Sequence, residues 1–244
     1  MNQDPQQYGS QFRTTHWSVV LEAGGGASPR RAAALDKLCR AYWEPICAFA
    51  RRRGRSPEDA KDLTQEFFAL LLERQDFAGL DPRKGKFRTF LLAAFSHYLA
   101  NDHDRATALK RGGGQTPVPL DHCAPDELSD NSARSDNALF LAYDRVWAGT
   151  ILLTALERLR GEMSAAGKAR QFAVLERFLT PTAAPAQYAA AAAELTVAES
   201  SVPVLVHRLR QQYRALVRDE VAQTVSTPME LEEEMRHLFA VLNQ

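Results

Sequence analysis

The chain has 244 residues, 30 acidic and 30 basic side chains and a hydrophobic content of 45%, which are ordinary values for a globular protein. Its length accommodates one large domain or two small ones, and no run approaches the ~20 apolar residues of a membrane-spanning helix. The first ten residues are polar and lack the basic-then-apolar pattern of a secretory signal. We therefore expect a cytoplasmic protein without a membrane segment.

Helical periodicity runs through the chain, because apolar residues recur at three- and four-residue spacing and strand-type alternation is nearly absent. We predict an all-α protein. The predicted helices are residues 14–23, 29–53 (as a helix pair), 56–74, 87–110, 137–160, 168–179, 186–195, 200–222 and 229–242. Pro45 should kink or break the second near Trp43. Ser56 and Pro57 suit the cap and the first position of the third.

A change of composition predicts a linker at residues 112–136, where a glycine triplet, three prolines and four acidic residues between positions 121 and 130 follow no helical period. The predicted organisation is an N-terminal extension with a short helix (1–29), a helical domain (30–111), the linker (112–136), a second helical domain (137–225) and a C-terminal helical extension (226–244). The chain is thus expected to contain two helical domains.

Basic charge is concentrated in one part of this electrically neutral chain. Residues 30–112 hold 17 Lys and Arg against 11 Asp and Glu, residues 113–180 hold 7 against 9, and residues 226–244 hold 1 against 4. This distribution favours local contact with phosphates combined with other contacts, rather than blanket electrostatic binding of nucleic acid.

Cysteine usage and short motifs argue against metal binding and catalysis. Cys39, Cys47 and Cys123 are scattered and have no Cys-x-x-Cys or His-x-x-x-His companion, so we expect buried reduced thiols rather than a zinc site. The chain contains no Gly-x-Ser-x-Gly, Walker or His-Glu-x-x-His motif. We expect no enzymatic activity, no cofactor and no small-molecule substrate.

An acidic stripe on the predicted helix 56–74 lies apart from the apolar stripe of the same helix. Taken alone, such a stripe is either a solvated helix face or a docking face. The run Asp-Ala-Lys-Asp-Leu-Thr-Gln-Glu-Phe-Phe at residues 59–68 resembles the core-binding signature of bacterial extracytoplasmic-function sigma factors, a subfamily of the sigma-70 family. The resemblance implies docking on the clamp helices of the largest RNA polymerase subunits. The implied contacts are Asp59, Asp62, Gln65 and Glu66.

The segment Phe-Arg-Thr-Phe-Leu at residues 87–91 resembles the family pattern Phe-Arg-x-Trp-Leu, which precedes the helix that melts and reads the minus-ten promoter element. Aromatic rings stack on unpaired bases, Asn pairs with base edges, and Arg or Lys holds phosphates. The implied DNA contacts are Arg88, Phe90, His97, Asn101, Arg105, Lys110 and Arg111. Core packing of Phe90 and plain surface positions for His97 and Asn101 are the alternatives.

Residues 186–195 and 200–222 have helix-turn-helix spacing. The run at 195–203 and His-Arg-Leu-Arg at 207–210 resemble the sigma domain that reads the minus-thirty-five element. Thr196 replaces the family's turn glycine, Ala198 a capping serine, and Pro203 a lysine. Because proline inside a helix costs about 3 kcal/mol, we predict a late helix start, with Ser200 or Ser201 as the cap and Pro203 in the first turn.

The DNA-facing surface of this helix-turn-helix is expected to be thin. Its implied contacts are Ser200, Ser201, His207, Arg208 and Arg210, with Arg214 at the rim. In the alternative interpretation, the arginines between positions 208 and 218 merely solvate a long helix.

The resemblance covers residues 30–111 and 138–222. The opening at residues 15–20 and the tail at 226–244 are similar to features of a divergent sigma-like group found in planctomycete-type bacteria. The family implies a transcription initiation factor whose partners are core RNA polymerase, promoter DNA and an anti-sigma factor. Two alternatives stay open. One is a sigma-like decoy that binds polymerase or an anti-sigma partner without productive promoter recognition. The other is a stand-alone helix-turn-helix regulator.

Overall fold

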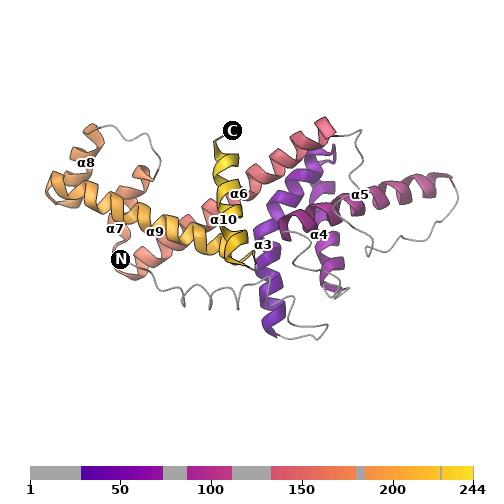
Figure 1. The fold of residues 1–244 in the computed structure, drawn as a ribbon, viewed down its shortest axis with the longest axis horizontal. Coiled ribbons are helices and arrows are strands. Elements are labelled where there is room, and N and C mark those ends of the chain that lie inside the picture. Colours follow the sequence, from indigo (N-terminus) through magenta and orange to yellow (C-terminus); the bar gives the residue numbers. More distant parts are fainter. Residues whose placement is uncertain (1–28, 74–86, 112–132, 180–184, 226, 244) are drawn as a thin grey trace. The chain divides into compact units, whose positions relative to one another are not determined.

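The computed structural model describes residues 29–73, 87–111, 133–179, 185–225 and 227–243. Over these ranges the chain is helical and contains no strand (Figure 1), which confirms the predicted all-α fold class. The helices are α3 (Pro29–Arg52), α4 (Pro57–Glu73), α5 (Phe87–Arg111), α6 (Ala133–Ala165), α7 (Ala169–Leu175), α8 (Pro185–Leu195), α9 (Val202–Ala222) and α10 (Pro228–Leu242), with the 3-10 turns η4 (Glu176–Phe178) and η5 (Glu199–Ser201). The predicted helix 14–23 and most of the predicted linker lie outside the described residues.

The chain divides into two compact units. Unit 1 comprises residues 1–150 and 221–244, and unit 2 comprises residues 151–220. The division falls within α6 and α9, so the end of the chain, which includes α10, belongs with the N-terminal helices. The boundaries predicted from the sequence assign residues 137–150 and 221–225 to the second helical domain instead. These boundaries stay a prediction.

Unit 1 is built around aromatic side chains contributed by α3, α4 and α5. The Phe67 ring centroid lies 5.0 Å from that of Phe95 and the Tyr42 centroid 5.2 Å from that of Phe87, both in edge-to-face geometry, which stabilises such pairs beyond their buried area. Four large side chains of α5 are buried in this core. They are Leu91, Phe95, Tyr98 and Leu99.

Helix α3 runs unbroken through Pro45, so the prediction of a helix pair broken near Trp43 was wrong. Proline removes one hydrogen bond from a helix, but here the residues on both sides belong to the core. Tyr42, Ile46 and Phe49 are each no more than 1% exposed. Their burial, at roughly 1.5–3 kcal/mol for each large apolar side chain, offsets the lost bond and keeps one continuous helix.

Helix α4 begins where the sequence predicts, because its cap is formed. The Ser56 Oγ accepts a hydrogen bond from the Asp59 backbone N–H at 3.1 Å, and Pro57 occupies the first helical position. This arrangement satisfies a donor that the helix itself leaves unpaired. The cap fixes the position of the acidic stripe along the chain.

The apolar character of α6 exceeds the expectation from the sequence. An 18-residue window within Ala138–Ala165 reaches a mean hydropathy of 1.3, so this helix is long and apolar enough to cross a membrane by length and composition alone. It is not an unbroken apolar run, because Asp144 and Arg145 lie within it. Trp147, Ile151 and Leu159 of this helix are buried within the protein.

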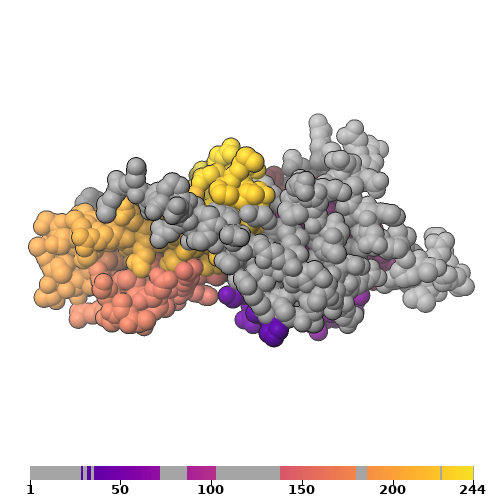
Figure 2. All heavy atoms as spheres, turned by 60° about the horizontal axis from the view of Figure 1, so that its bottom comes forward, coloured from indigo at the N-terminus to yellow at the C-terminus, as the bar shows by residue number. Residues whose placement is uncertain are grey.

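Helix α10 is capped and partly exposed. The Thr227 side chain accepts a hydrogen bond from the Glu230 backbone N–H at 3.2 Å, and Glu230 places a negative charge in the first turn. The helix reaches the molecular surface in Figure 2, in yellow. Its inward side chains, Leu231 and Leu238, are at most 2% exposed, so α10 packs as part of unit 1 and is not a free tail.

Candidate functional site

The predicted polymerase-binding residues share the exposed side of α4. Asp59, Asp62, Gln65 and Glu66 are all exposed. The opposite side of the helix is buried, with Ala60 and Thr64 at 0% exposure among its members. The helix therefore divides into a core side and a polar side, and we call these four residues the acidic face.

The last carboxylate of the acidic face is held by the neighbouring helix. The Tyr98 hydroxyl of α5 donates a hydrogen bond to Glu66 Oε2 at 2.7 Å. The Tyr98 ring is itself packed against Phe67 and Phe95, at centroid distances of 5.7 and 6.1 Å. Such supported side chains lose little conformational entropy on binding, so Glu66 is pre-positioned for a partner.

The predicted DNA-contacting side of α5 is only partly described. His97 is exposed, and Phe90 and Asn101 are half-buried. The Phe90 ring lies 6.4 Å from Phe87 between centroids, which leaves both of its interpretations, base stacking and core packing, open. The backbone of α5 extends to Arg111, but the side chains of Arg105, Lys110 and Arg111 lie outside the described ones.

Residues 38–103 match the Sigma-70 region 2 family. The matched segment contains the acidic face and the first two-thirds of α5. The match supports a place for this chain in the sigma-70 family, whose members are transcription initiation factors and not enzymes, and it implies contact with core RNA polymerase and promoter DNA. No curated protein and no solved structure matches the chain significantly.

Arg88 of the Sigma-70 region 2 domain is not presented to solvent as a phosphate contact would be. Its side chain is 12% exposed and pairs with Asp144 of α6 and with Glu234 of α10, the latter at 3.3 Å between Nε and Oε2. Its guanidinium carbon lies 5.1 Å from the centroid of the Trp147 ring. The expectation that Arg88 contacts DNA is thus at odds with this structure, because two carboxylates already occupy the guanidinium.

The ion pairs of Arg88 belong to a wider polar cluster. His237 Nε2 lies 2.8 Å from Asp144 Oδ2, and the Tyr143 hydroxyl donates to the Arg88 carbonyl oxygen at 3.4 Å. Burial alone would lower the pKa of Arg88, but the charges of Glu234 and Asp144 outweigh it and raise that pKa. We call these five residues the Arg88 cluster.

The Arg88 cluster was not expected from the sequence. Its members come from α5, α6 and α10, and the two members on different helices that are nearest in sequence, Arg88 and Tyr143, are 55 residues apart. The only signal was the presence of Asp144 and Glu234 on the apolar side of their helices. Burial raises the pKa of the adjacent Tyr42 hydroxyl and, well above its ordinary value, that of Tyr143, so both tyrosines stay neutral in the cluster.

The cysteines behave as expected where they are described. Cys47 is 1% exposed and Cys39 is half-buried, and both are free thiols. Burial and the charge of Asp36 raise the pKa of Cys39 to about 11, which makes its thiolate scarce at neutral pH. Cys123 lies outside the described residues, within which no group of three or more His, Cys, Asp or Glu side chains could hold a metal ion.

In unit 2, the chain bends by 103° between Ala186–Leu195 and the segment Glu199–Ala222, an angle typical of helix-turn-helix motifs. Thr196 makes the turn in the left-handed region, at φ 58°. The Val197 N–H bonds to the Ala192 carbonyl at 3.1 Å and the Thr196 N–H to Ala193 at 3.3 Å, which is a Schellman cap. Thr196 therefore adopts the left-handed conformation that suits the family's glycine, at a conformational cost of about 1–2 kcal/mol.

The predicted late start of the following helix is confirmed. The 3-10 turn Glu199–Ser201 precedes α9, which begins at Val202 and has Pro203 as its second residue. At this position the missing N–H of proline costs little, because the first turn of a helix leaves these donors unpaired. The capping role of Ser200 or Ser201 stays a prediction.

The predicted DNA contacts of α9 separate into available and engaged residues. Ser200, His207 and Arg208 are exposed, and Ser201 is half-buried. Arg210 instead donates from Nε to the carbonyl oxygen of Phe178 at 2.8 Å, so it holds the end of η4 in place. This bond uses one of the five guanidinium donors and fixes the direction of the side chain.

Proposed function

We propose that this chain is a sigma factor of the extracytoplasmic-function type, which binds core RNA polymerase and directs it to promoters. The Sigma-70 region 2 match at residues 38–103 carries the proposal. The acidic face supports it, because a side of α4 that is polar, exposed and braced by Tyr98 suits a preformed docking surface. Placement in the extracytoplasmic-function subfamily rests on the sequence runs at 59–68 and 87–91, and placement in the planctomycete-type group rests on the segments 15–20 and 226–244.

In the proposed mechanism, the acidic face docks on the polymerase, and the exposed side of α5 captures the melted minus-ten element through Phe90, His97 and Asn101. The helix-turn-helix of unit 2 binds the minus-thirty-five element through Ser200, His207 and Arg208, side chains that the structure leaves accessible or nearly so. Polymerase performs the chemistry, so the chain needs no cofactor. The proposed location is the cytoplasm, where both partners are.

The first experiment is run-off transcription with purified core polymerase on a pool of genomic upstream fragments. The test variant combines Asp62→Lys with Glu66→Lys, and the matched control is Glu44→Lys, which reverses an exposed carboxylate on α3. We expect specific transcripts with the native chain and the control, and loss of core binding with the double variant. Core binding that survives the double charge reversal would refute the docking role of the acidic face.

A second function, a polymerase-binding decoy, is favoured by one observation. Two of the arginines expected to contact DNA, Arg88 and Arg210, are engaged inside the protein. Core binding without any specific transcript would support the decoy. DNA binding without core binding would instead support a stand-alone regulator and contradict both polymerase-dependent functions.

A further inference from the structure

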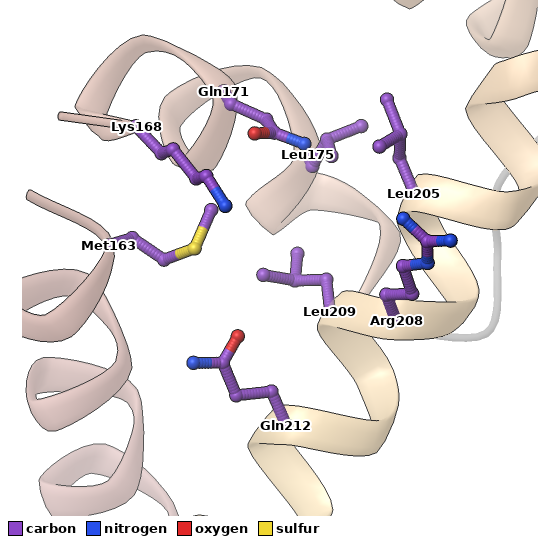
Figure 3. A pocket seen from close by; sticks show the side chains of 8 residues that line it. All are labelled: Met163, Lys168, Gln171, Leu175, Leu205, Arg208, Leu209 and Gln212. Atoms are coloured by element: carbon purple, nitrogen blue, oxygen red, sulfur yellow. The ribbon is translucent and has the colours of Figure 1, made fainter. Parts of the chain in front are cut away.

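Unit 2 contains a hollow of about 190 Å³ between the end of α6, α7 and the first turns of α9 (Figure 3). We call it the α7–α9 hollow. Its apolar lining includes Met163, Leu175 and Leu209, each at most 7% exposed. The amides of Gln171 and Gln212 add polar groups to the wall. An apolar base with a few polar groups at the side is the usual lining of a small-molecule site.

Two positively charged side chains, Lys168 and Arg208, also line the hollow. Some other arginines of this unit form ion pairs, as Arg160 does with Glu176 at 3.1 Å. Within the described residues, neither Lys168 nor Arg208 has an ion-pair partner. In Figure 3 the Lys168 amino group extends from one side of the hollow, and the Arg208 guanidinium lies on the other. The hollow thus combines uncompensated positive charge with apolar surface.

We propose that the α7–α9 hollow binds a small amphipathic anion, a carboxylate or phosphate group carried on an apolar body. The anionic group would bind Lys168 and Arg208, because charge-assisted hydrogen bonds to such groups are the stronger kind. The apolar body would cover Met163 and Leu209. Glu162 accepts from the lining Gln212 at 3.4 Å but is paired with Arg158 at 3.2 Å, so its charge is already engaged by Arg158.

Two alternative roles of Lys168 and Arg208 predict different results in a binding experiment. Lysine and arginine stems often cover apolar surface while their charged ends stay in water, in which case no ligand binds. Alternatively, Arg208 and Lys168 hold a DNA phosphate, in which case the apolar body of a ligand contributes nothing. The amphipathic ligand is favoured because the apolar lining and the two unpaired cations occur at one place.

The test is a calorimetric titration of the full chain with phenyl phosphate, whose anionic and apolar parts match the hollow. Inorganic phosphate, which lacks the apolar body, and benzyl alcohol, which lacks the charge, are the matched ligands. Lys168→Met and Arg208→Met remove the charges and keep the stems. Arg214→Met is the control, because Arg214 is exposed on the same helix and does not line the hollow.

We expect phenyl phosphate to bind about tenfold or more tightly than either matched ligand, and each hollow variant to lose about tenfold in affinity, while Arg214→Met binds as the native chain does. Equal binding of inorganic phosphate would indicate a phosphate site for DNA and overturn the proposal. Equal loss with Arg214→Met, no loss with the hollow variants, or no saturable binding would overturn it too. Circular dichroism confirms that each variant is folded. The titration contains neither polymerase nor DNA, so a failure of the amphipathic-ligand proposal leaves the polymerase-binding part of the proposed function untouched.

Discussion

Replacement of Glu234 by glutamine tests whether the Arg88 cluster holds α10 to unit 1. Glu234 is 2% exposed, and its carboxylate accepts from Arg88 at 3.3 and 3.4 Å. Breaking a buried pair by removing one partner typically costs 3–5 kcal/mol. Because Arg88 retains Asp144, and because these two bonds are longer than the usual 2.7–2.9 Å of charge-assisted bonds, we expect a loss of about 3 kcal/mol, at the lower end of this range.

The assay is urea unfolding followed by circular dichroism, with Glu232→Gln as the matched control on the exposed side of α10. The control should change the midpoint little, because surface ion pairs contribute little to stability. A triple variant, Arg88→Met with Asp144→Leu and Glu234→Leu, should recover much of the loss, since apolar replacement of all three removes the desolvation cost of the charges and leaves no carboxylate without its guanidinium partner. A Glu234→Gln chain as stable as the native one would refute the reasoning.

Three further variants test other contacts. Thr196→Gly should stabilise the protein by roughly 1 kcal/mol in thermal unfolding, because glycine adopts positive φ without steric cost; a lower midpoint would contradict a strained turn. Tyr98→Phe removes the bond to Glu66 and should cost about 1 kcal/mol while weakening core binding less than Glu66→Lys does. Because burial raises the pKa of Tyr42 and Tyr143, the folded state retains their protons longer than the unfolded state. Stability should therefore fall as the pH rises above about 10, and Tyr42→Phe should flatten that fall in urea unfolding at several pH values.

Local rules predicted the helices well, because the signals that start and stop a helix lie within a few residues. Ser56 and Pro57 predicted the start of α4, and the cost of an internal proline predicted the late start of α9 before Pro203. Pro45 shows where local rules fail. Pro45 removes a helical hydrogen bond, but the burial of Tyr42 and Ile46 keeps the helix continuous. That burial depends on helices elsewhere in the chain.

The sequence was sufficient to predict which site residues are exposed. It was not sufficient to predict the contacts of residues whose partners lie far away in the chain. The exposure of the acidic face required only a helix with one apolar side, so spacing was sufficient to predict it, whereas the docking role of the face stays a prediction. Arg88 and Arg210 were assigned to DNA from local motifs, yet their partners are Asp144 and Glu234 for the first and the carbonyl of Phe178 for the second. Those partners lie 32 to 146 residues away in the chain, where no local pattern reveals them.

The contacts of Arg88 and Arg210 within the protein affect how the chain would bind a promoter. Phosphate contacts supply most of the sequence-independent affinity for DNA, whereas base contacts supply the specificity. Among the described residues assigned to DNA, the accessible or half-buried ones are mostly neutral, such as Phe90, Asn101 and His207, and Arg208 is the exposed arginine. Such a set suits bases that are already unpaired more than an intact duplex. A factor of this kind would depend on polymerase for affinity, which makes the acidic face of α4 the decisive surface in the proposed function.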